Sequence, residues 1–170
     1  FDQVSQSVTM ARQAGVENIS LDLMFGLPSQ TLADWQETLD AALSLSPTHL
    51  SCYGLIPEEG TPLKADLDAG RLTLPDEDVE RAMYDLALSR TAQAGMMQYE
   101  ISNFALPGRA CRHNLGYWRQ TPYLGLGASA SSCLSDPAGK AAWLRTTNPP
   151  DIADYIDMVQ RHDDTRRQLD

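Results

Sequence analysis

Chemically capable side chains gather at three places in the sequence. Asp22 lies within an apolar run, Glu100 and Asn103 follow a second run, and His113 begins a short string that adds an amide and two aromatic rings. A carboxylate accepts hydrogen bonds from ligand hydroxyls, an imidazole can ligate a metal, and tyrosine and tryptophan combine ring faces with polar edges. These three places are the candidates for a binding site.

Each candidate also has a purely structural interpretation. Asp22 is either a buried carboxylate satisfied by neighbouring groups or a ligand contact. Glu100 and Asn103 either reach a pocket or hold the following loop in place. The string His113-Asn114-Leu115-Gly116-Tyr117-Trp118 either binds a flat, partly apolar ligand or anchors a loop through its rings. The residues alone leave these alternatives open.

The elements that must position these residues follow a repeated strand–helix pattern. In order, the predicted elements are a helix ending near Gly15, strands over 19–25, 49–55 and 97–101, and helices over 31–43, 63–69 and from Pro75 to Gly95. This alternation predicts an α/β fold with a sheet of parallel strands and right-handed crossovers. The first strand is apolar enough to predict burial on both faces. Ligands of such folds collect at the carboxyl ends of the strands.

The pattern changes after Ser102. Residues 103–122 have the composition of a long ordered loop with room for one helical turn, and further strands are predicted within 123–134 and over 141–146. A last helix is predicted after Pro150, and the charged residues 162–170 are expected to fray. The Gly125-Leu126-Gly127 sequence lacks the third glycine of a dinucleotide fingerprint and favours close backbone packing instead.

Composition excludes several classes of partner. The 170 residues carry 13 Lys+Arg against 23 Asp+Glu, a net charge of −10, which argues against nucleic-acid binding and attraction to anionic membranes. No apolar run approaches the roughly 18 residues of a transmembrane helix. Cys52, Cys111 and Cys133 do not have disulfide-framework spacing, so a reducing cytoplasm is expected. Cys111 and His113 are only two potential ligands, fewer than a zinc site needs.

An ordered series of motifs resembles the radical S-adenosylmethionine family of oxygen-independent coproporphyrinogen III oxidase-like proteins. The series comprises Leu21-Asp22-Leu23-Met24-Phe25-Gly26-Leu27-Pro28-Ser29-Gln30-Thr31, His49-Leu50-Ser51-Cys52-Tyr53, Glu59-Gly60-Thr61 and Tyr99-Glu100-Ile101-Ser102-Asn103-Phe104. The resemblance extends from about residue 1 to about residue 155. Within that family, the string at 113–118 is similar to the His-Asn-x-x-Tyr-Trp motif of the haem chaperone branch, HemW.

This resemblance implies a fold and a division of the chain. The implied fold is the C-terminal half of a partial (βα)₆ TIM-like barrel of parallel strands. Residues 1–104 would supply strand–helix units of the barrel, 105–161 would complete its edge, and 162–170 would form the tail. Because the chain begins at Phe1 within a predicted helix, we expect it to be a piece of a longer protein whose truncated barrel self-associates.

The resemblance also implies cofactors and their contacts. Asp22 would contact the ribose of S-adenosylmethionine, and Ile56 would lie on the adenine side. His113 would contact haem iron, and the haem pocket would include Asn114, Tyr117 and Trp118. Haem would then pass to haem-accepting proteins.

Two departures from the family pattern limit what the chain can do alone. The Cys-x-x-x-Cys-x-x-Cys motif that binds the [4Fe–4S] cluster is absent from the sequence, so we expect its ligands to precede Phe1 and assign no catalytic residue. Relatives often carry a histidine where this chain has Ala130-Ser131. The alternatives are a coproporphyrinogen III oxidase, and an unrelated α/β-barrel enzyme or binding module.

Overall fold

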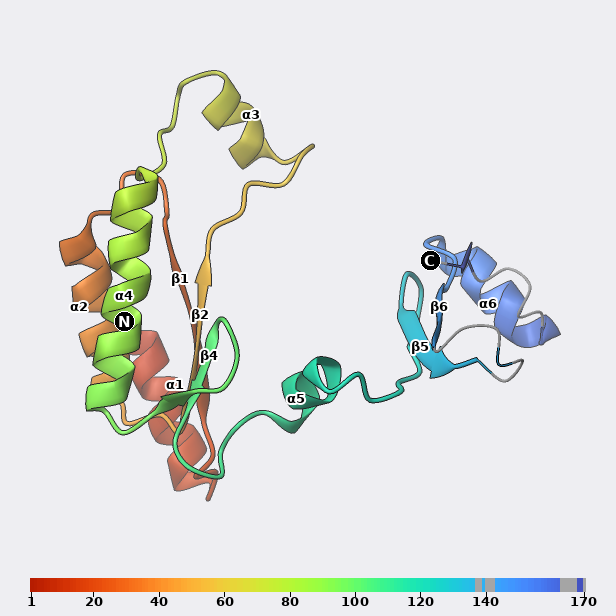
Figure 1. The fold of residues 1–170 in the computed structure, drawn as a ribbon, viewed down its shortest axis with the longest axis horizontal. Coiled ribbons are helices and arrows are strands. Elements are labelled where there is room, and N and C mark those ends of the chain that lie inside the picture. Colours follow the sequence, from red (N-terminus) through yellow and green to blue (C-terminus); the bar gives the residue numbers. More distant parts are fainter. Residues whose placement is uncertain (137–138, 140–142, 163–167, 170) are drawn as a thin grey trace. The chain divides into compact units, whose positions relative to one another are not determined.

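The computed structural model describes the chain apart from residues 137–138, 140–142, 163–167 and 170 (Figure 1). It divides into two compact units, residues 1–110 and 111–170. The first contains α1 (Asp2–Gln13), β1 (Ser20–Phe25), α2 (Leu32–Ser44), β2 (His49–Gly54), α3 (Pro62–Asp68), α4 (Glu77–Gln93), β3 (Met97–Gln98) and β4 (Asn103–Ala105). The second contains α5 (Arg112–Trp118), β5 (Ser131–Ser135), β6 (Trp143–Thr147), α6 (Ile152–Arg161) and β7 (Gln168–Leu169).

The sheet of the first unit is mixed rather than parallel. Its strand order is β1-β2-β4-β3; β1 and β2 are parallel, whereas β4 runs antiparallel to both β2 and β3. The prediction of an all-parallel sheet is therefore wrong beyond β2. The predicted strand over 97–101 ends at Gln98, and the chain returns as β4 from Asn103. A parallel partner requires a crossover of about a dozen residues, and this short connection permits only antiparallel pairing.

Helix α2 begins with a capping box and packs through its apolar stripe. The Thr31 side chain accepts a hydrogen bond from the Asp34 backbone N–H, and the Asp34 carboxylate accepts from the backbone N–H of Thr31. Trp35 is fully buried, and its indole N–H donates to the Met83 carbonyl of α4 at 2.8 Å. Helices α2 and α4 lie together on one side of the sheet (Figure 1).

Strand β1 is covered on one face only, which corrects the prediction of burial on both. Leu21, Leu23 and Phe25 pack toward the helical core, whereas Ser20, Asp22 and Met24 are exposed. Alternate residues of a strand point to opposite faces, so one face of β1 is left free by the helices.

The second unit is built around an antiparallel sheet of order β5-β6-β7. β5 starts at Ser131, later than the start of the predicted strand, and Tyr123 joins it only through an isolated bridge to Cys133. Of the predicted strand over 141–146, residues 141–142 lie outside the described part, and β6 begins at Trp143. Within the expected tail, Gln168–Leu169 pair with β6 as β7, and residues 163–167 and 170 are outside the described part.

Helix α5 lies inside the segment that was predicted as a long loop, and so does β4. Seven residues, Arg112–Trp118, form this helix. Its N-cap residue, Cys111, makes no side-chain capping hydrogen bond. No helix in the described part of the chain is both long and apolar enough to cross a bilayer.

Candidate functional site

The sheet face opposite α2 and α4 carries a group of polar side chains from three strands. Its strands are in register, so paired residues share a face: Asp22 is opposite Ser51, and Ser51 is opposite Asn103. The polar members of this face are Ser20, Asp22, His49, Ser51 and Asn103. We call these five residues the polar sheet face.

Asp22 is an exposed member of the polar sheet face. The sequence suggested a carboxylate enclosed by apolar neighbours, but Leu21 and Leu23 point to the opposite side of the strand. Exposure removes the need for a structural partner, since water can solvate the charge. Asp22 lines a hollow of about 520 Å³ between β1, α1 and α2. Its oxygens are available to accept hydrogen bonds from a hydroxyl-bearing ligand.

His49 is the buried centre of this face, and the sequence analysis did not single it out as a site residue. Its Nδ1 lies 2.8 Å from the Ser20 hydroxyl oxygen, and its Nε2 lies 2.7 Å from the Tyr99 hydroxyl oxygen. Burial lowers the pKa of His49, although the charges of Asp22 and Glu100 act in the opposite direction. A neutral imidazole can donate from one nitrogen and accept at the other, which fits its position between two hydroxyls.

Asn103 joins the polar sheet face to the turn that follows β3. Its Oδ1 accepts a hydrogen bond from the Ser51 hydroxyl at 2.8 Å, and its Nδ2 donates to the Glu100 carboxylate. Glu100 also accepts from the backbone N–H of Ser102 at 3.0 Å. Of the two interpretations left open by the sequence, these contacts favour the structural one, in which Glu100 and Asn103 hold the turn.

A second hollow, of about 560 Å³, lies at the carboxyl end of β2 beside the start of α4. Ile56 is 80% exposed and lines it together with Tyr53, Glu80 and Arg81. A Cβ atom at Gly54 would lie 3.1 Å from a Glu80 carboxylate oxygen, so glycine allows the helix to approach the strand closely. Asp22 does not line this hollow. Asp22 and Ile56 therefore line two different hollows.

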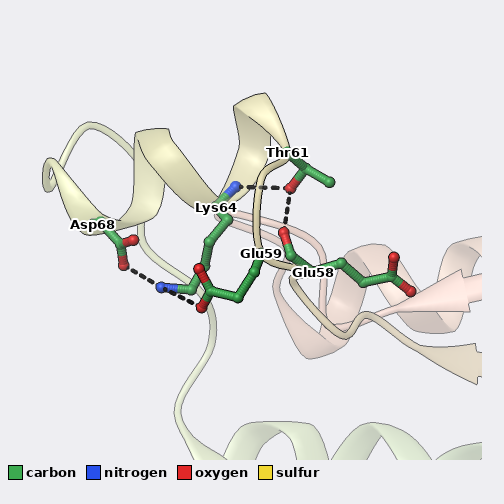
Figure 2. A network of polar contacts seen from close by, with 5 residues as sticks. All are labelled: Glu58, Glu59, Thr61, Lys64 and Asp68. Atoms are coloured by element: carbon green, nitrogen blue, oxygen red, sulfur yellow. Dashed lines mark hydrogen bonds and ion pairs between the residues drawn. The ribbon is translucent and has the colours of Figure 1, made fainter.

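The turn after β2 is held by a polar network around α3 (Figure 2). Thr61 begins the helix: its hydroxyl accepts from the Lys64 backbone N–H at 3.2 Å and donates to the Glu58 carbonyl at 2.7 Å. The Lys64 ammonium contacts Asp68 at 2.5 Å and Glu59 at 3.5 Å. The hydrogen bond to Asp68 is the main cause that raises the pKa of Lys64. Glu59-Gly60-Thr61 thus has a structural role here.

In the second unit, the predicted haem string forms helix α5. The His113 and Tyr117 rings, one turn apart, meet edge to face with centroids 4.7 Å apart, and Tyr117 meets Tyr123 in the same way at 4.9 Å. His113 is exposed, and 49% of Tyr117 and 56% of Trp118 are exposed. Asn114 is half-buried. Large exposed rings on a short helix offer an apolar surface beside an accessible imidazole.

Close packing explains Gly125, as the sequence predicted, whereas Gly127 has no atom of the described residues within 4 Å of a built Cβ and instead adopts a positive φ of 110°. A Cβ atom at Gly125 would lie 2.3 Å from the Ser131 carbonyl oxygen, which no side chain tolerates. Asn148, which sequence analysis missed, is buried and donates from Nδ2 to the Gly127 carbonyl at 2.8 Å. This asparagine holds the glycine-containing turn against the sheet.

The cysteines do not assemble a metal site within the described residues. In the part of the chain that the structure describes, Cys52, Cys111 and Cys133 form no disulfide, and no group of three or more potential ligands gathers. Burial, with a smaller contribution from the charge of Asp22, raises the pKa of the Cys52 thiol to about 12. A thiol with such a pKa is a poor metal ligand, because metals bind the thiolate. These residues do not fit a [4Fe–4S] cluster.

No protein-family model matches the chain, but several curated proteins are similar to it in sequence. The chain is 43% identical over 156 residues to the haem chaperone HemW of Bacillus subtilis and 36% identical over 145 residues to that of Escherichia coli. These matches cover 92% and 85% of this chain, but 39% and 37% of the relatives. A mitochondrial radical S-adenosyl methionine domain-containing protein 1 of Danio rerio is 38% identical, over 96% of this chain and 37% of that protein.

A solved structure supports the fold. Coproporphyrinogen III oxidase HemN from Escherichia coli, a radical SAM enzyme, aligns with a TM-score of 0.66 at 20% identity, over 98% of this chain and 38% of that one. The chain thus spans about two-fifths of the length of the proteins it matches. It has an α/β fold similar to that of HemN, and its sequence is HemW-like, as its motifs predicted.

Proposed function

We propose that this chain forms the haem-contacting part, and half of the S-adenosylmethionine-binding barrel, of a HemW-type haem chaperone. The observation that carries the proposal is the string His113–Trp118 on helix α5, whose His113, Tyr117 and Trp118 are exposed, in a chain that is 43% identical to a curated haem chaperone. Haem is the cargo in this proposal, and it would be passed to haem-accepting proteins.

The residues of α5 fit haem chemically. The accessible His113 imidazole can ligate iron through a ring nitrogen, and the edge contact with Tyr117 restricts how the ring turns. Trp118 and Tyr117 offer exposed ring surface for the apolar macrocycle, and Asn114 lies on the next position of the same helix. The assignment of these four residues rests on the motif and on the exposure of His113, Tyr117 and Trp118.

Asp22 and Ile56 are the proposed S-adenosylmethionine contacts. The exposed Asp22 carboxylate would accept hydrogen bonds from the ribose hydroxyls, and Ile56 would contribute apolar surface on the adenine side. The [4Fe–4S] cluster would take its ligands from outside these residues. When bound, it would supply the electron for reductive cleavage of S-adenosylmethionine.

In the same proposal, the first unit is part of a partial (βα)₆ barrel. The parallel pair β1 and β2, joined through helix α2, is one strand–helix–strand unit of the kind that a partial (βα)₆ barrel repeats. The antiparallel strands β4 and β3 would then follow its last parallel strand. A cytoplasmic location is supported by the three cysteines, which form no disulfide among the described residues and would tend to pair in an oxidising compartment.

The alternative function is coproporphyrinogen III oxidation, the activity named for HemN, whose fold is similar to that of this chain. Both functions would use the same α/β barrel, so the fold does not separate them. The two predict different measurements: a haem chaperone binds haem stoichiometrically, whereas the oxidase turns over coproporphyrinogen III.

Haem titration of the full-length protein tests the proposal. We expect a Soret band that saturates with added haemin and that His113→Ala weakens or shifts. His162→Ala is the matched control, because His162 is an exposed histidine on the cap of α6 in the same unit. An unchanged spectrum in His113→Ala would rule out His113 as the iron ligand, and coproporphyrinogen turnover by the reconstituted protein would favour the oxidase.

A further inference from the structure

Helix α5 lies in a stretch of sequence that contains no carboxylate side chain. Between Glu100 and Asp136 there is no Asp or Glu, although the chain as a whole has a net charge of −10. The same stretch contains Arg109, Arg112 and Arg119. The excess of negative charge falls in residues 1–110, and positive and negative side chains balance in residues 111–170. The segment that carries α5 is therefore locally cationic, which suits an anionic ligand.

Helical geometry sorts the side chains of α5 into three rows. With about 100° per residue, His113 and Tyr117 form a central row, and Asn114 and Trp118 lie about 100–140° to one side of His113. Arg112 and the C-cap residue Arg119 lie about 100–120° to the other side, roughly 10 Å apart along the axis. The cations and the tryptophan therefore flank the histidine on opposite sides.

We propose that Arg112 and Arg119 bind the two propionate groups of haem, and that the macrocycle lies with its apolar edge toward Trp118. This inference rests on the proposed haem binding at His113. Haem is itself amphiphilic: both carboxylates project from one edge, and the opposite edge carries only hydrocarbon substituents. The arginine row and the tryptophan row match these two edges, with the iron between them.

The chemistry and exposure of the two arginines support this role. A planar guanidinium forms paired, charge-assisted hydrogen bonds with a carboxylate, which an ammonium does not. Both side chains are exposed, and the ion pairs found among the described residues use Lys64, Arg71, Arg90 and Arg161 instead. Arg112 also lies in the first turn of α5, where a cation opposes the helix dipole, so helix stability does not account for it.

The test compares haemin with its dimethyl ester, which keeps the iron and the macrocycle but has no propionate charge. Both are titrated into the full-length protein in the same detergent, and the Soret band gives affinity and ligation together. We expect Arg112→Gln and Arg119→Gln each to weaken haemin binding by about three- to tenfold, since each removes a charge-assisted contact. The Soret maximum should stay unchanged, because His113 still ligates the iron.

Three comparisons decide the outcome. The ester should bind the unmodified protein more weakly than haemin, and the two glutamine variants should not weaken ester binding further. Arg71→Gln, which removes an exposed arginine paired with Asp66 in the first unit, is the matched control and should bind haemin normally. Equal binding of haemin and ester, or full haemin affinity in the double variant, would overturn the propionate assignment while leaving His113 ligation intact. The Soret titration of His113→Ala tests iron ligation by His113 independently of the arginine variants.

Discussion

His49 is held by two hydroxyl partners and has little contact with solvent. Only 6% of its surface is exposed, and the Ser20 and Tyr99 hydroxyls lie at 2.8 Å and 2.7 Å from its two ring nitrogens. A buried imidazole with a lowered pKa is neutral in the folded protein at a pH where the unfolded chain is already protonated. Proton binding then favours unfolding.

We therefore predict that stability falls with acidification in a specific window. The contribution of His49 is complete above the ordinary histidine pKa of 6.5 and decreases as the pH falls below it toward the lower folded-state pKa. His49→Gln should remove this part of the pH dependence and cost about 1–3 kcal/mol at neutral pH, because hydroxyl partners lose a hydrogen bond. Urea unfolding at several pH values measures both effects. His162→Gln is the control, and equal slopes in the two variants would contradict the assignment.

Cys52 differs from the other cysteines in burial. Its side chain is 1% exposed and its thiol pKa is raised to about 12, so thiolate is scarce at neutral pH. We predict that iodoacetamide labels Cys111 and Cys133, which are partly exposed, well before Cys52 in the folded protein. Peptide mass spectrometry after timed quenching gives the three rates. Labelling in denaturant should equalise them, and fast native labelling of Cys52 would show that the strand opens readily.

At the scale of elements, the start of α2 depends on a reciprocal cap. The Thr31 hydroxyl accepts from the Asp34 N–H. The Asp34 carboxylate accepts in turn from the Thr31 hydroxyl and backbone N–H, and these two hydrogen bonds lower the pKa of Asp34. We predict that Thr31→Ala lowers the free energy of unfolding by about 0.5–2 kcal/mol, the usual cost of losing an N-cap. Thr38→Ala in the same helix is the matched control, because its hydroxyl only bonds back to the Asp34 carbonyl. Similar losses in both variants would argue against a specific cap effect.

The contact between α2 and α4 is centred on Trp35. Its ring is fully buried, lies 5.4 Å from the Phe25 ring centroid and donates to the Met83 carbonyl. We predict that Trp35→Phe costs about 1–3 kcal/mol, since the carbonyl is left without its donor and the smaller ring leaves space. Trp118→Phe, at a position that is 56% exposed, should leave denaturant unfolding nearly unchanged. Comparable losses in the two variants would contradict this assignment of the core.

The same elements show what the sequence could and could not predict. Helix α2 was predicted because a cap and a complete apolar stripe coincide over 13 residues. For helix α5 the sequence indicated no more than a helical turn within a loop, because seven residues are too few to display helical periodicity and Gly116 interrupts them. The turn at residues 99–102, which makes β3 and β4 antiparallel, was missed because residues 99–101 were predicted to continue the strand. Without that turn, the sequence does not indicate the direction of the next strand.

The residues of the candidate site could be predicted only where their own residue types indicate chemistry, and not where they depend on contacts between distant parts of the sequence. Asp22 and His113 were found from their own residue types, and both are accessible in the structure. His49 and Ser51 were overlooked although they alternate with Leu50 and Cys52, a pattern that indicates a polar face on a buried strand. Tyr99, the partner of His49, lies 50 positions away, and Asn103, the partner of Ser51, lies 52 positions away, so only the folded sheet brings each pair together.

At the scale of the whole molecule, the first unit leaves apolar surface beside β1. Strand β1 is at the end of the strand order, and Phe1 and Val4 of the α1 region line the hollow of about 520 Å³ at this edge. Phe1 is 65% exposed, Val4 48% and Met10 60%. An unpaired strand edge beside apolar side chains is a site for association.

We therefore predict that the 170-residue chain, produced alone, self-associates through this edge. Light scattering coupled to size exclusion should give an apparent mass above 18.7 kDa that rises with protein concentration. Val4→Glu should reduce the association, because it introduces charge where Val4 lines the hollow. Thr9→Glu, an exposed change on the same helix, should not. A concentration-independent monomer that unfolds cooperatively would contradict the prediction, and it would mean that two-fifths of the relatives' length is sufficient for a stable fold.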